Sequence, residues 1–172
     1  ANGTRDFAYQ PPVLPAGSYD RIATALAAGN KLVVATISAD TDPGYVSVTR
    51  LNVTGGVVQL DKATTSTVHA VAGISGVSSG ATVKLTGTGG DQIYDGPSSP
   101  TQHGVHGLNG TLDLNGKDET TSYLDGTSGV VDNTSGTACT FTIGNQDVNS
   151  TFGGTIQNTG ASVAITKIGT GT

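Results

Sequence analysis

Three groups of side chains in this sequence could carry chemistry: a pair of histidines, a set of acidic residues and three spaced aromatic residues. His103 and His106 form an H-x-x-H pair, and two such histidines can chelate a metal ion where the backbone brings both rings together. Helical backbone would do this, but Pro97 and Pro100 mark the segment as a loop. The spaced D-x-D-x-D-G pattern of a calcium loop is absent. We therefore predict no metal site and no cofactor.

The acidic residues that could cluster are Asp91, Asp95, Asp118, Glu119, Asp125 and Asp132. Enzymes that cleave polysaccharides use clustered carboxylates, as a pair or with a metal ion. No strand-like stretch here carries paired aspartates. Asp118 and Glu119 lie in a polar stretch from Gly116 to Ser122, with Lys117 as its basic residue. We interpret these groups as solvated loop charge, and we predict no catalytic residues and no enzyme activity.

The aromatic residues Tyr94, Tyr123 and Phe152 follow one another at intervals of 29 positions. If they point inward, they stack as part of the core. If they point outward, they form an apolar track on which sugar rings can pack their C–H faces, while neighbouring polar side chains bind the hydroxyl groups. Both alternatives stay open at this point. The candidate carbohydrate-binding residues are Tyr94 and Tyr123 for ring stacking, and Asp95, Asp118 and Asp125 as acceptors for hydroxyl groups.

A repeated strand pattern indicates which elements position these residues. Val83-Lys84-Leu85, Leu112-Asp113-Leu114 and Phe141-Thr142-Ile143 are apolar-polar-apolar triplets, also at intervals of 29 positions. Alternation of this kind puts two side chains on one face of a strand. The triplet Val58-Gln59-Leu60 comes 25 positions before the first, and Val163-Ala164-Ile165 comes 22 positions after the last. Repeats of tens of residues are typical of stacked coils that bury their inner faces on one another, so we predict an all-β solenoid.

The composition agrees with many short strands joined by tight turns. Only 12% of the residues are charged, and the chain contains 26 glycines. A chain of 172 residues is long enough for one domain with a buried core. The net charge is −5 with scattered basic residues, which argues against nucleic acid or an anionic membrane as a partner. Cys139 is the single cysteine, and we interpret it as a small buried residue.

The chain divides into three expected parts. Residues 1–17 are polar and proline-bearing and predict an extended lead-in. Residues 18–29 have Ser18 as a possible N-cap, apolar residues at helical spacing and a glycine stop, so they predict a short α-helix that caps the open end of the solenoid. Residues 30–172 would then form the solenoid as one domain, with the β-branched run Lys31–Ile37 as its first strand.

The C-terminal segment carries a resemblance to a known family. Phe152 to Thr172 reads FGGTIQNTGASVAITKIGTGT, and it closely resembles the autotransporter-associated β-strand repeat, in which F-x-G-x-I-x-N-x-G runs into L-x-K-x-G-x-G-T and a further strand. The stretch from Leu51 to Leu60 is similar in style. The resemblance implies a right-handed parallel β-helix on an exported bacterial protein. Because the sequence stops where the next strand would begin, we expect a module of a longer polypeptide.

Two functions of different class fit these features. The sequence is also similar to β-helical xylan-binding modules of plant-cell-wall-degrading enzymes. This similarity implies a non-catalytic carbohydrate-binding module that recognises xylan or a related β-glycan, secreted as part of a glycoside hydrolase with an appended catalytic domain. The alternative is a structural spacer or adhesin segment of an autotransporter-like protein attached to the cell surface. The expected cap favours the binding module, because a slice of a longer solenoid has no need of its own cap.

Overall fold

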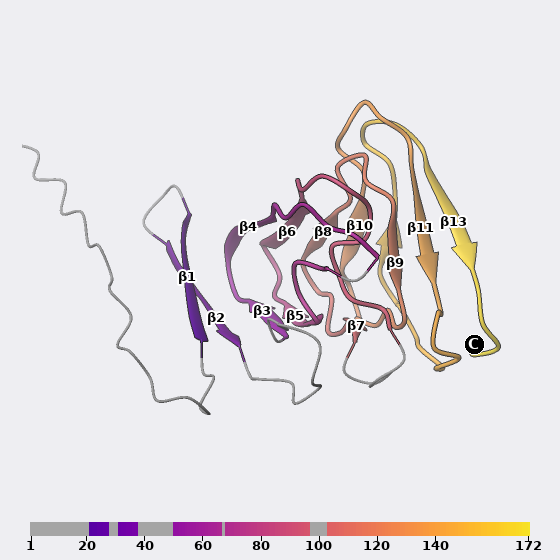
Figure 1. Cartoon of the computed structure of the whole chain (residues 1–172), viewed down its shortest axis with the longest axis horizontal. Helices are drawn as coiled ribbons and strands as arrows, with labels where there is room; N and C mark the ends of the chain where they lie inside the picture. The colour runs from indigo at the N-terminus through magenta and orange to yellow at the C-terminus, as the bar shows by residue number, and fades with distance from the viewer. Residues whose placement is uncertain (1–20, 28–30, 38–49, 67, 97–102) are drawn as a thin grey trace, which may run out of the picture.

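The computed structural model describes residues 21–27, 31–37, 50–66, 68–96 and 103–172 (Figure 1). The described chain is all-β and contains no α-helix, and its strands run parallel in three of its four sheets. Within these residues there is accordingly no helix that is long and apolar enough to cross a membrane. The prediction of an all-β chain is confirmed.

The largest sheet has five parallel strands in the order β12-β10-β8-β6-β4. These are β4 (Gly56–Leu60), β6 (Ala81–Leu85), β8 (Thr111–Asp113), β10 (Val130–Asp132) and β12 (Thr155–Ile156). Their register aligns apolar residues from strand to strand: Val58 pairs with Val83, Val83 with Leu112 and Leu112 with Val131. All four side chains are buried, because alternation along each strand turns them to the same face.

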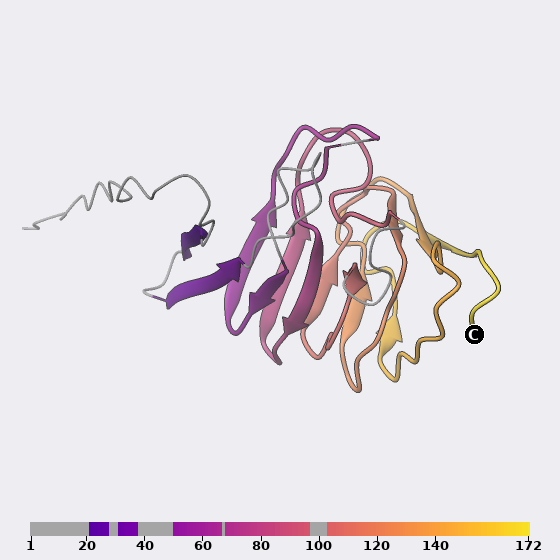
Figure 2. The same cartoon turned by 60° about the horizontal axis from the view of Figure 1, so that its bottom comes forward.

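Two smaller parallel sheets have three strands each. One contains β3 (Leu51–Val53), β5 (Gly73–Val77) and β7 (Gly104–Val105). The other contains β9 (Glu119–Thr121), β11 (Cys139–Ile143) and β13 (Val163–Lys167). From β3 to β13 the chain alternates between the five-stranded sheet and one of the smaller sheets. Figure 2 shows the strands side by side in chain order. The core lies inside this arrangement, with Ile74, Leu85 and Phe141 fully buried.

At the N-terminal end, the predicted cap helix is wrong over residues 21–27. These residues form β1 (Arg21–Ala27), which pairs antiparallel with β2 (Lys31–Ile37) beside β3 and β4 (Figure 1). The first predicted strand, Lys31–Ile37, is confirmed. The reason for the error is tertiary: the β-branched strand β2 needs a hydrogen-bonding neighbour, and the segment just before it supplies one despite its helical spacing. Residues 1–17, 18–20 and 28–29 lie outside the described residues.

The predicted period of 29 residues holds for one step and then fails. Val83 pairs with Leu112 at this interval, and Val58 pairs with Val83 at the predicted interval of 25. Leu112, however, pairs next with Val131 in β10, only 19 positions on. Phe141 lies in a different sheet, where it pairs with Glu119 and, 24 positions on, with Ile165. The third triplet is therefore not the next layer of the same sheet, because the loops between strands differ in length from layer to layer.

Candidate functional site

Tyr94, Tyr123 and Phe152 are all partly exposed. Each tyrosine alternates with a neighbour that enters the core, Ile93 before Tyr94 and Leu124 after Tyr123, and both neighbours are buried. The tyrosines are half-buried. Phe152 instead packs against the core cluster. Neither tyrosine is therefore a fully buried core residue.

The three aromatic residues do not form a continuous ladder. The backbone next to Tyr94 pairs with the layer at Val71, the backbone next to Tyr123 pairs with Val105, and Phe152 pairs with Gly126. Histidine rings fill the spaces beside the tyrosines instead. The structure therefore replaces the predicted aromatic track with two separate tyrosine–histidine clusters.

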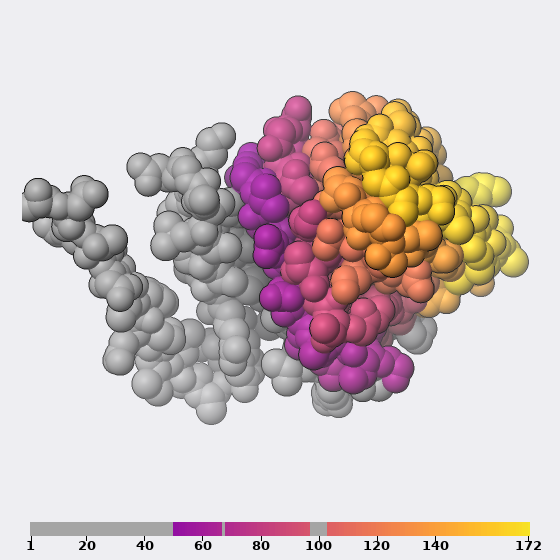
Figure 3. Space-filling model, turned by 90° about the horizontal axis from the view of Figure 1, so that it is seen from above, coloured from indigo at the N-terminus to yellow at the C-terminus, as the bar shows by residue number. Residues whose placement is uncertain are grey.

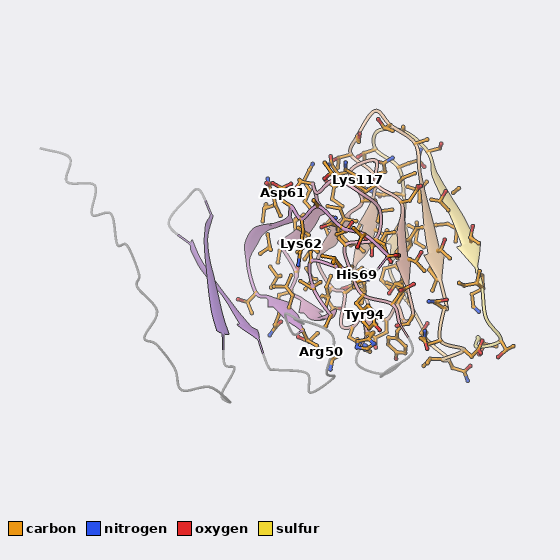
Figure 4. All side chains as sticks on the ribbon, in the orientation of Figure 1. Arg50, Asp61, Lys62, His69, Tyr94 and Lys117 are labelled. Carbon is orange, nitrogen blue, oxygen red and sulfur yellow. The ribbon has the colours of Figure 1, made fainter. Side chains whose placement is uncertain are left out.

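The first cluster surrounds Tyr94. Its ring contacts His69 edge-on, with ring centroids 5.1 Å apart, and His103 likewise at 4.6 Å. His69 and Tyr94 lie on the same side of the molecule, away from Asp61 and Lys117 (Figure 4). These contacts fix the orientation of the ring.

Asp95, next to Tyr94, is tied to the loop that follows β11. Its carboxylate accepts a hydrogen bond of 2.9 Å from the Asn145 amide, and Gln146 donates one of 2.8 Å to its carbonyl oxygen. Burial is the main reason why the pKa of Asp95 is raised, while the neighbouring His69 opposes this rise. The loop therefore joins segments about fifty positions apart in sequence and brings its polar residues onto the tyrosine side of the molecule.

The second cluster surrounds Tyr123. Its ring is stacked on the imidazole of His106, with centroids 4.3 Å apart and an interplanar angle of 21°. The neighbouring Asp125 carboxylate is the main cause of the raised pKa of Tyr123, and burial adds to it. Asp125 also accepts a hydrogen bond from the N–H of Gly107. Gly104 adopts a φ of 105°, and an added Cβ there would lie 2.7 Å from backbone atoms of Tyr123, so this close approach requires glycine.

An open groove of about 530 Å³ lies beside Tyr123. It is lined by Tyr123, Asp125, Asn149, Ser150, Thr151 and Thr172. Among these described residues none is basic, and each carries a hydroxyl, amide or carboxylate group. An aromatic ring with such polar groups around it is suited to a ligand that has both C–H faces and many hydroxyl groups.

The structure connects four of the five predicted site residues through the two clusters. The segment from His103 to His106 joins the clusters, because His103 contacts Tyr94 and His106 contacts Tyr123. Asp95 comes directly after Tyr94 in the first cluster, and Asp125 comes two positions after Tyr123 in the second. Asp118, the fifth, precedes β9 and joins neither cluster through a side-chain contact within the described residues. It is exposed, its carboxylate accepts a hydrogen bond from the N–H of Thr140, and its carbonyl oxygen accepts one from the N–H of Asp91.

The interpretation of the acidic residues as solvated loop charge is wrong for Glu119. This residue begins β9 and is fully buried, and its two carboxyl oxygens accept hydrogen bonds from the N–H groups of Gln92 (2.7 Å) and Ile93 (2.9 Å). Burial, and then the charge of Asp91, raise the pKa of Glu119 well above its ordinary value. Oδ2 of Asp91 lies 3.6 Å from Nδ1 of His69, and the pKa of Asp91 is itself raised, mainly by burial. The sequence gives no signal for this pair, because a strand reading Glu-Thr-Thr has no apolar alternation.

Asp132 is also buried, contrary to the same interpretation. Its carboxylate accepts hydrogen bonds from the side chain of Gln157 and from the N–H and hydroxyl of Thr159. Burial alone would raise the pKa of Asp132, but these hydrogen bonds together lower it. The carboxylate therefore connects two neighbouring layers of the fold and has a structural role.

The H-x-x-H pair does not form a metal site in the described structure. His103 and His106 contact different tyrosines, and Nδ1 of His103 lies 3.1 Å from the carbonyl oxygen of Gly96. Within the described ranges, no group of three or more His, Cys, Asp or Glu side chains is placed to hold a metal ion.

Comparisons with known proteins identify no relative of this chain. No protein family model matches this chain, and neither a curated protein nor a solved structure matches it. The resemblance to the autotransporter-associated repeat and to xylan-binding modules therefore stays a prediction.

Proposed function

We propose that this chain is a non-catalytic carbohydrate-binding module, built on a right-handed parallel β-helix, that binds a plant cell-wall polysaccharide, with xylan as the first candidate. The observation that carries the proposal is the open groove in which the ring of Tyr123 stands among hydroxyl, amide and carboxylate groups. A sugar ring would pack its C–H face on Tyr123, and Asp125 and Asn149 would bind its hydroxyl groups.

The parallel pairing of successive layers supports both the β-helix and an extended ligand. Layers stacked about 4.8 Å apart present similar groups again and again, and a polysaccharide is itself a repeating chain. Tyr94 and Asp95 would provide a second contact on the same side of the molecule. Several weak contacts along one ligand chain give useful affinity without a deep pocket.

The charge of the site favours a neutral glycan. Among the residues that line the groove, Asp125 is the side chain that is charged at neutral pH, so an acidic sugar would meet a like charge there. The carboxyl pair Asp91–Glu119 does not change the proposed absence of catalysis, because Glu119 is fully buried and cannot contact a polymer. In this proposal the module is secreted and appended to the catalytic domain of a glycoside hydrolase, which the composition and the resemblance support.

Affinity gel electrophoresis on xylan, cellulose derivatives and other β-glycans tests the function. The wild-type protein is expected to be retarded by xylan almost independently of salt, and Tyr123→Ala and Asp125→Asn are expected to weaken the retardation. Asp61→Asn, which removes an exposed carboxyl that does not line the groove, is the matched control. No retardation of the wild-type protein on any of these polysaccharides would refute the proposal.

One observation favours the spacer or adhesin as a second candidate. β12 and β13 end their sheets, and they leave Ile156 37% and Ile165 48% exposed. The C-terminal residues, yellow in Figure 3, lie on the surface of the described molecule. In a spacer these strand edges would pair with another layer. Failure to bind any glycan, together with end-to-end association, would favour this function.

A further inference from the structure

We propose that His106 is the positioning residue of the carbohydrate groove: its imidazole ring backs the ring of Tyr123, and its segment fixes Asp125. The inference rests on the proposed function, and it identifies the residue that prepares the groove for its ligand.

The ring contact is the first part of the argument. The imidazole of His106 and the phenol of Tyr123 are nearly parallel, at 21°, with centroids 4.3 Å apart. This stack occupies one face of the phenol ring, and Tyr123 is also one of the residues that line the groove. The two residues come from neighbouring layers, whose backbones pair at Val105 and Leu124. The paired layers thus set the position of the ring before any sugar arrives.

The carboxylate beside Tyr123 is held by the same segment. The neighbouring Asp125 carboxylate raises the pKa of the Tyr123 phenol, and Asp125 accepts a hydrogen bond from the N–H of Gly107, the residue after His106. Oδ2 of Asp125 lies 3.9 Å from Nδ1 of His106. Gly107 adopts a φ of 56°, which glycine tolerates without strain. His106 and Gly107 therefore order both groove side chains, and ordering a site in advance reduces the entropy that binding costs.

The surroundings of His106 keep its imidazole uncharged. Burial is the main reason why the pKa of His106 is lowered, and the charge of Arg50 adds to this, while Asp125 and a hydrogen bond with the backbone of His103 oppose it. Nε2 is buried and has no hydrogen-bond partner within the described structure. A protonated ring would place a charged N–H there without an acceptor. If the stack comes apart, His106 regains its ordinary pKa of 6.5 and binds a proton more readily than it does in the stack. Acid should therefore favour the state in which the stack is broken.

Two substitutions separate the shape of the ring from its titration. His106→Phe keeps a flat ring that can stack on Tyr123 but carries no titratable nitrogen. His106→Leu keeps a similar volume without a flat ring. Val163→Ala in β13, which is partly buried against the core, controls for a general loss of stability. Binding of a xylohexaose oligosaccharide would be measured by isothermal titration calorimetry across the pH range below and above 6.5.

We expect His106→Leu to weaken binding at neutral pH about five- to tenfold, and His106→Phe to stay within about threefold of the wild-type protein. Wild-type affinity should fall as the pH drops below 6.5, and the His106→Phe variant should lose most of this dependence. If the wild-type protein binds but His106→Leu binds as tightly as Val163→Ala, the positioning role is wrong and the proposed function stands. An acid response that persists unchanged in His106→Phe would also refute the role. If the wild-type protein binds no β-glycan at all, the proposed function is wrong and this role falls with it.

Discussion

Replacing Glu119 by glutamine is expected to remove a pH-dependent part of the free energy of unfolding. The buried carboxyl of Glu119 has a pKa well above its ordinary value of 4.5, because of burial and the neighbouring Asp91. Above pH 4.5 the unfolded chain releases this proton while the folded chain keeps it. The contribution of this carboxyl to the free energy of unfolding is thus complete below pH 4.5, and it is lost as the pH rises from 4.5 through the raised pKa of Glu119. The loss is about 1.4 kcal/mol for each pH unit in that interval.

The glutamine itself has a cost that does not depend on pH. Its amide oxygen can accept the hydrogen bond of one of the two N–H groups that bind Glu119, those of Gln92 and Ile93, but its amide nitrogen cannot accept the other. One buried N–H is left unsatisfied, at a cost of about 1–3 kcal/mol. The variant should therefore be less stable than the wild-type protein at pH 4.5, and the difference should shrink or reverse as the pH rises.

Urea unfolding followed by circular dichroism, in steps of one pH unit upward from pH 4.5, measures both effects. Asp61→Asn removes an exposed carboxyl and controls for the change in net charge. Wild-type and Glu119→Gln proteins that lose stability in parallel over this range would refute the reasoning, because the pH dependence would then come from other groups. Asp91 and Asp95, whose pKa values burial also raises, would be the next residues to examine.

Two further predictions concern the layers around the site. Asp132→Asn should lower the free energy of unfolding by about 1–3 kcal/mol at neutral pH. The lowered pKa of Asp132 gives stability that is present above pH 3.8 and is lost as the pH falls, so the difference between the variant and the wild-type protein should fade below pH 3.8. A difference of equal size in acid would contradict the role of the carboxylate. Phe141→Ala should cost about 3–5 kcal/mol because its side chain is fully buried, whereas Ile165→Ala, at an exposed position of the paired strand, should cost less than about 1 kcal/mol. Thermal unfolding that shows equal losses for these two variants would contradict the burial of β11.

The sequence was sufficient for the fold where local pattern and pairing agree. Val58, Val83 and Leu112 alternate with polar residues, and the same alternation decides which side of each strand enters the core. The predicted helix failed because the spacing of apolar residues in Arg21–Ala27 carries no information about the neighbouring strand Lys31–Ile37, whose backbone it pairs with. Pairing between segments is a tertiary effect that overrides a weak local preference.

The same distinction explains which parts of the candidate site could be predicted. The spacing of aromatic residues in the sequence predicted Tyr123 as a site residue, and Tyr123 lines the groove, but alternation alone left its direction open because Ser122 and Leu124 on both sides of it are buried. Which residue lies in the next layer depends on the length of the loop between them, and these lengths vary, as the steps of 29 and 19 positions on either side of Leu112 show. The stack of His106 on Tyr123 depends on such a step, and a change in the length of the loop between them would place another residue behind the tyrosine. Tyr123 and Asp125 could therefore be named from the sequence, whereas Asn149, Ser150, Thr151 and Thr172, which line the same groove, and the residue that stacks on Tyr123 are known only when the layers are in register.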